Sequence, residues 1–206
     1  MKKILLVSGA FIFATVILLV SIFNSSSITY SLSKSPEPAL NGIKAPDSES
    51  KVPYMGNVLP DSPLWGLKVL RDKIWFGVTT SHLRKAQLAL LFSDKRILMT
   101  KVLFEKGKPD IALSTFLEGE KYLVTAVNEE KNARSQGVNT DDFLMKLASS
   151  AAQHKVIMDG LMYLVPDDIK PEVIEVEKFA KNAFESAREG LNFRNLPIPK
   201  DPFDRE

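Results

Sequence analysis

The pattern of apolar and polar positions divides the chain into an apolar run, a polar stretch and a helical region. After Lys2 and Lys3, residues 4–23 carry no charge, and the next charged residue is Lys34. A helix of twenty residues rises about 30 Å, which is the thickness of the hydrocarbon core of a bilayer. We therefore expect a transmembrane anchor at residues 4–23.

The flanking charges predict the orientation of this anchor. Two lysines precede the apolar run and no basic cluster follows it, which favours a cytoplasmic N-terminus made of residues 1–3. The domain after the anchor is then extracytoplasmic. The alternative is a secretory signal peptide, whose apolar region normally has about 7–15 residues. Cleavage after the small residues near Ser25 and Ser27 would release a secreted protein, so both forms stay open.

Residues 24–57 predict a flexible linker. They are rich in Ser, Pro, Lys and Glu and contain few large apolar residues. Such a composition buries too little apolar surface to offset the entropy lost on ordering.

From residue 58 onward, the apolar spacing changes to the intervals of three and four that are typical of helices. Gly107, Gly137 and Pro166 mark helix ends, and Thr140 is expected to cap the helix that follows it. The pattern predicts helices at about residues 63–77, 80–106, 109–135, 141–165 and 168–192. No alternating strand pattern occurs.

The predicted fold class is therefore all-α. An N-terminal transmembrane helix at residues 4–23 and a flexible tether at 24–57 precede a four- or five-helix antiparallel bundle at 58–192. The tail at 193–206 contains three prolines and is expected to be extended.

The first helix of the bundle has two possible placements. Leu64, Leu67, Leu70 and Ile74 share one face, while its two tryptophans are interleaved with basic residues. We expect the helix to pack across the bundle with the indole rings in a groove. The alternative is that it lies in a membrane interface.

Charge is balanced after the predicted anchor but is unevenly distributed. Residues 34–206 carry 25 basic and 25 acidic side chains, which gives no indication of nucleic-acid binding. Residues 62–108 carry ten basic and three acidic side chains, and residues 109–206 carry twelve and eighteen. The two halves either pair within the bundle, or the basic half is drawn to anionic lipid head groups.

The sequence contains no arrangement of residues that is typical of a catalytic or metal-binding site. The absence of cysteine excludes disulfides and thiolate sites, and no Gly-x-Ser-x-Gly elbow occurs. His82 is expected to be solvated. His154 lies on the apolar seam of the helix predicted at residues 141–165, and we expect it to be an interior histidine whose hydrogen bonds are satisfied within the protein. Neither follows a Glu by three positions, so the di-iron signature is absent. We therefore assign no catalytic, cofactor-binding or metal-ligating residue and no cofactor.

Three acidic pairs have spacings that do not converge on one helix face. We expect them to be solvated or to interact with helix N-termini. They are Glu118/Glu120, Glu129/Glu130 and Asp141/Asp142.

Part of the helical region resembles a known family. It begins with Leu59-Pro60-Asp61-Ser62-Pro63-Leu64. Similar stretches follow at residues 85–96 and, after His154, at 166–171. These motifs resemble domain of unknown function 5667, a helical domain of exported bacterial and archaeal proteins, over residues 58–192. The resemblance implies a helical, anchored or secreted protein and implies no catalytic residue.

The sequence favours a non-enzymatic interaction or structural module of the cell envelope. Its expected partners are membrane lipid, through the N-terminal helix, and an envelope protein that the sequence does not identify. The alternative is a helical-bundle metal-binding protein or hydrolase whose site forms only in three dimensions.

Overall fold

A computed structural model describes residue 56 and residues 58–204, and the predicted anchor and most of the linker lie outside these residues. The described part consists of helices and contains no strand. No helix within residues 58–204 combines the length and apolar character that a membrane span requires.

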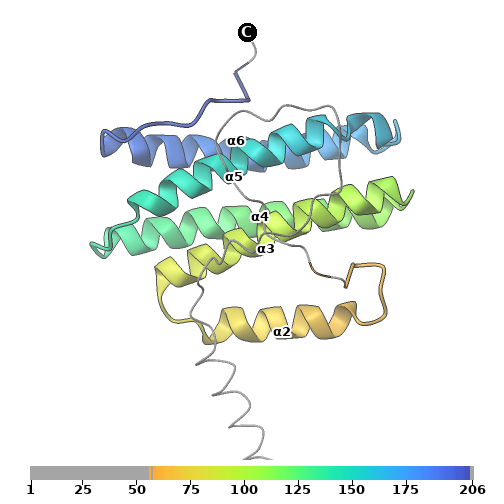
Figure 1. Ribbon diagram of the computed structural model, residues 1–206, viewed down its shortest axis with the longest axis horizontal. Coiled ribbons are helices and arrows are strands. Elements are labelled where there is room, and N and C mark those ends of the chain that lie inside the picture. Colours follow the sequence, from red (N-terminus) through yellow and green to blue (C-terminus); the bar gives the residue numbers. More distant parts are fainter. Residues whose placement is uncertain (1–55, 57, 205–206) are drawn as a thin grey trace, which may run out of the picture. The chain divides into compact units, whose positions relative to one another are not determined.

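Five α-helices and one 3₁₀-helix follow one another along the chain. The α-helices are α2 (Trp65–Val78), α3 (His82–Glu105), α4 (Pro109–Ser135), α5 (Asp141–Asp159) and α6 (Lys170–Phe193), and the 3₁₀-helix is η1 (Met162–Leu164). Helices α3 to α6 pack as a bundle, with α3 against α4 and α5 against α6, while α2 lies outside on α3 (Figure 1). The predicted all-α class and helical bundle are confirmed for the described residues.

Two apolar clusters fill the bundle, and each draws side chains from all four helices. The Phe184 cluster includes Leu90, Leu123, Leu144 and Phe184. The Phe116 cluster includes Ile97, Phe116, Met158 and Val173. On α3, α4 and α5, buried polar residues lie between the segments that enter the two clusters: Ser93 and Arg96, Glu120, and His154, respectively. Together they form a polar layer between the clusters, to which α6 contributes no buried polar side chain.

Two helix ends differ from the expectation. Helix α5 stops at Asp159, although its apolar spacing predicted a helix to Val165. Gly160 is a weak helix former, and the residue before Pro166 disfavours helical geometry, so the chain continues as the short η1. Leu161 and Val165 are nevertheless buried in the Phe116 cluster.

The predicted cap at Thr140 is also wrong in its bonding. Thr140 does precede the first turn of α5, but it makes no capping hydrogen bond. Its hydroxyl donates instead to Glu130 Oε1 at 2.6 Å, because that buried carboxylate requires donors.

The C-terminal tail lies along α6 (Figure 1). Phe203 packs on Phe184 with the ring centroids 5.7 Å apart, and Arg188 Nη1 donates to Asp201 Oδ2 at 2.9 Å. The tail therefore covers one side of the Phe184 cluster.

Helices α3 and α4 approach most closely at Gly119. A Cβ atom added there would lie 2.9 Å from Arg96 Cβ, and the Ser93 hydroxyl donates to the Gly119 carbonyl at 2.8 Å. Only glycine therefore fits this crossing without a shift of α3.

We expect Gly119→Ala to destabilise the protein by about 1–2 kcal/mol, because overpacking outweighs the gain in helix propensity. Gly66→Ala on α2 is the matched control, since no atom lies within 4 Å of the added Cβ. It should be neutral or slightly stabilising. Urea denaturation followed by circular dichroism measures both changes, and equal effects would contradict the close approach.

Candidate functional site

The strongest concentration of ionisable groups is the polar layer inside the bundle. Its centre, here called the His154 cluster, consists of Asp94 on α3, Glu120 on α4, and Ser150 and His154 on α5. His154 and Glu120 are essentially inaccessible to solvent, at 2% and 0% exposure.

Both nitrogens of the His154 ring are engaged by carboxylates of other helices. Nδ1 lies 2.9 Å from Glu120 Oε1, and Nε2 lies 3.1 Å from Asp94 Oδ1. Ser150 Oγ donates to the same Asp94 oxygen. Burial alone would lower the pKa of His154, but the charge of Glu120 and the hydrogen bonds to both carboxylates raise it to about 9. The ring is therefore an imidazolium that donates from both nitrogens at neutral pH.

This geometry limits the chemistry of the cluster. A doubly protonated ring can neither accept a proton from a nucleophile nor coordinate a metal. Ser150 donates to Asp94, so it is not hydrogen-bonded to a general base of the serine–histidine type. Within the described residues, no group of three or more His, Asp or Glu side chains is arranged to hold a metal ion. The ion pairs of the His154 cluster link α5 to α3 and to α4.

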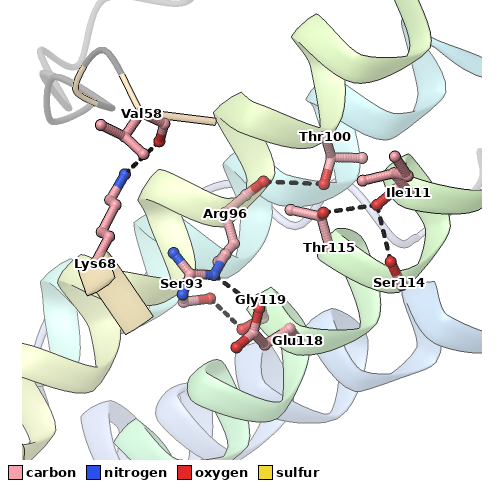
Figure 2. Close-up of polar contacts among 10 residues, drawn as sticks. All are labelled: Val58, Lys68, Ser93, Arg96, Thr100, Ile111, Ser114, Thr115, Glu118 and Gly119. Carbon is pink, nitrogen blue, oxygen red and sulfur yellow. Dashed lines mark hydrogen bonds and ion pairs between the residues drawn. The ribbon is translucent and has the colours of Figure 1, made fainter. Parts of the chain in front are cut away.

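A second group, the Arg96 cluster, connects the polar layer to α2. Arg96 is buried, and its Nε donates to Glu118 Oε2 at 3.0 Å (Figure 2). Its guanidinium carbon lies 4.4 Å from the centroid of the Trp65 ring and 5.9 Å from that of Tyr122. Arg96 Nη2 is buried without a hydrogen bond among the described residues, and these two aromatic faces partly compensate its charge.

Lys68 belongs to the same surroundings. Its Nζ donates to the Val58 carbonyl at 2.9 Å and lies 5.1 Å from the Trp65 ring centroid (Figure 2). Burial, together with the nearby positive charge of Arg96, lowers the pKa of Lys68 to about 8. Lys68 thus holds the segment before α2 on that helix, and the contact of Trp65 with Arg96 joins α2 to α3.

The structure corrects three expectations about charged residues. Glu120 and Glu130 were expected in solvent but are buried, with His154 and Thr140 as partners. His82 was also expected to be solvated, but it is half-buried, with Nδ1 2.6 Å from Glu129 Oε2. His154 lies in the interior, as its place in the seam predicted.

The sequence contained a signal for the buried acids. Glu120 lies four residues after Phe116 and three before Leu123, which places it in the apolar register of α4. Arg96 and Thr100 occupy the corresponding register of α3. A polar residue at a core position of a helix therefore marks the polar layer.

Comparison with known proteins gives one match. The family described as "Domain of unknown function (DUF5667)" matches residues 57–168, just over half of the chain. No curated protein and no solved structure matches. The matched segment contains α2 to α5 and ends before α6.

The raised pKa of His154 predicts a pH-dependent stability. The folded protein keeps a proton up to about pH 9 that the unfolded chain loses near its usual 6.5. The contribution is complete below pH 6.5 and is lost as the pH rises through 9. We expect the free energy of unfolding, relative to His154→Gln, to fall with a slope approaching 1.4 kcal/mol per pH unit in this window, on the order given by linkage.

The difference between the two proteins removes the opposite effect of Lys68, whose lowered pKa makes the free energy of unfolding rise with pH above 8. A difference that is independent of pH between 6.5 and 9 would contradict a charged His154.

Proposed function

Because the chain belongs to the domain of unknown function 5667 family, whose description names no activity, we propose its role from its own residues. The proposed role is that of a membrane-anchored, exported helical module of the cell envelope that acts by binding and not by catalysis. Its partners are membrane lipid, through residues 4–23, and an envelope protein.

The observation that carries the non-enzymatic part is the occupation of His154 within the protein. Its two nitrogens contact Glu120 and Asp94, and the ring is 2% exposed. A general base must reach the proton of its substrate within about 3 Å, directly or through one water. Both nitrogens of His154 are thus used in ion pairs within the bundle and are not available to a substrate, which favours a binding role.

The membrane part is supported by the sequence pattern. An uncharged run long enough to span a bilayer precedes a linker that is too polar to form a core. The neutral balance of residues 34–206 favours a protein partner over nucleic acid.

We expect the full-length protein to remain in the membrane pellet after a carbonate wash, since an uncharged and mainly apolar segment of twenty residues in the bilayer resists extraction at high pH. Mass spectrometry of the retained protein should find Met1 or Lys2. Deletion of residues 4–23 is the control and should release the protein. A soluble wild-type form that begins near Ile28 would refute the anchor and favour secretion.

Zinc and cobalt titrations test the metal-binding alternative. One equivalent of either ion should leave the melting temperature of the wild-type protein unchanged, because a protonated His154 provides no ligand atom. An increase in melting temperature that His154→Gln abolishes would overturn the non-enzymatic reading and support a metal-binding bundle.

A further inference from the structure

Helix α2 turns an apolar face toward solvent. Four aliphatic side chains of α2 and that of Leu64, the residue before it, are exposed, and we call them the α2 stripe: Leu64 56%, Leu67 67%, Leu70 55%, Ile74 49% and Val78 45%. At 100° per residue they fall within an arc of about 120°. The other exposed large apolar side chains of the described residues are spread over α4, α5, η1, α6, a loop and the tail. The α2 stripe is therefore the one concentrated apolar face among them.

The opposite face of α2 holds the helix on α3. Trp65 lies on Arg96, and Trp75 contacts Phe92 edge to face with the ring centroids 6.3 Å apart. Asp72 is on the same side and is 2% exposed. The expected contact of the tryptophans with the bundle is confirmed. Because these bulky groups occupy the contact face, the α2 stripe cannot turn inward.

Positive charge surrounds the α2 stripe. Arg71 is 64% exposed and, by helical spacing, lies beside Leu64 and Val78, while Lys73 is exposed at its flank. Some of these charges are paired: Arg71 with Asp72, Arg96 with Glu118, and Lys106 and Lys108 with Asp61. Residues 61–108 nevertheless carry ten basic and four acidic side chains.

The charge is polarised across the domain. Helix α2 lies on the outer side of α3, and α6 lies on the far side of the bundle (Figure 1). Residues 62–108 carry a net charge of +7, and residues 109–206 carry −6. The α2 stripe is thus on the positive side of the domain, which an anionic surface would attract.

We propose that the α2 stripe lies in the headgroup region of an anionic lipid bilayer, with its leucines among the acyl chains and the adjacent bases near lipid phosphates. An amphipathic helix with basic flanks binds such an interface through the burial of its apolar side chains and through the attraction between its basic side chains and the anionic lipids. The proposal rests on the proposed anchor, because only residues 58–64 separate the predicted linker from α2. A flexible linker of 34 residues has an end-to-end distance of about 30–35 Å. It would hold α2 close to the membrane at high effective concentration.

The absence of cysteine allows one residue at a time to be labelled in the full-length protein. Leu70→Cys places a polarity-sensitive fluorophore in the α2 stripe. Asn182→Cys places it on the exposed face of α6 as the control. Each protein is reconstituted at low density into phosphatidylcholine vesicles with or without phosphatidylglycerol, and part of the lipid carries brominated acyl chains.

We expect several-fold quenching of the Leu70→Cys probe by brominated lipid in the anionic vesicles and little in the neutral ones. High salt should weaken the quenching, and the Asn182→Cys probe should not respond. Lys73→Glu should reduce quenching of the Leu70→Cys probe. Lys131→Glu, the same charge change at an exposed site on α4, should not.

Other outcomes would overturn the proposal. Equal quenching in neutral and anionic vesicles would contradict the role of charge. An emission spectrum of the Leu70→Cys probe that is typical of an apolar environment, without quenching by brominated lipid, would show that protein covers the α2 stripe. If that emission depends on protein density the cover is a second copy, and otherwise it is the chain's own apolar run. Retention after carbonate with an unresponsive probe would reject this inference alone, whereas release by carbonate would reject the proposed function whatever the probe reports.

Discussion

The packing of α3, α4 and α5 depends on a buried charge that side chains of different helices must match. The His154 imidazolium lies between Glu120 and Asp94, so a slip of α5 against α3 or α4 would separate it from a carboxylate partner. Removing one partner of such a buried pair costs about 3–5 kcal/mol, far more than a small slip of apolar side chains. The Phe184 and Phe116 clusters lie on either side of this polar layer and supply the apolar burial. Apolar area drives the helices together, and the ionic contacts select the register.

The sequence predicted the parts of this architecture that depend on local patterns. The apolar face of α6, which includes Val176, Ala180 and Phe184, is buried, and regular spacing along the sequence alone determines that face. The burial of Glu120 and Glu130 was not predicted. The partner of Glu120 is His154 on α5, which helical spacing within α4 does not report. Glu130 is buried against Thr140 and against Arg134, which lies one turn later on α4. The early end of α5 likewise depends on where the chain must turn to bury Leu161. Of the candidate site, the sequence located His154 but not its partners.

The orientation of α2 follows from the same packing. Arg96 follows Asp94 by two residues on α3, and its side chain reaches out of the layer to lie between Trp65 and Tyr122. Gly119 of α4 lies close to the Cβ atom of Arg96 and restricts the position of its side chain. The aromatic face of α2 binds to this fixed guanidinium, which leaves the leucine face outside. The helical spacing of three leucines and Ile74 correctly predicted an amphipathic helix. The larger aromatic side chains of the other face, however, decide which face is buried.

Stability and surface chemistry are therefore carried by different groups. The proton on His154 is enclosed by carboxylates of the bundle and does not face α2, so its titration changes the free energy of unfolding without changing the charge around the α2 stripe. The cations beside the stripe are arginines and lysines, and arginine stays charged across the range in which His154 titrates. Lys68, with a pKa of about 8, is directed to the Val58 carbonyl and Trp65. The free energy of unfolding and the surface chemistry of the α2 stripe therefore rest on different side chains, and the two properties can be separated by measuring both in one protein.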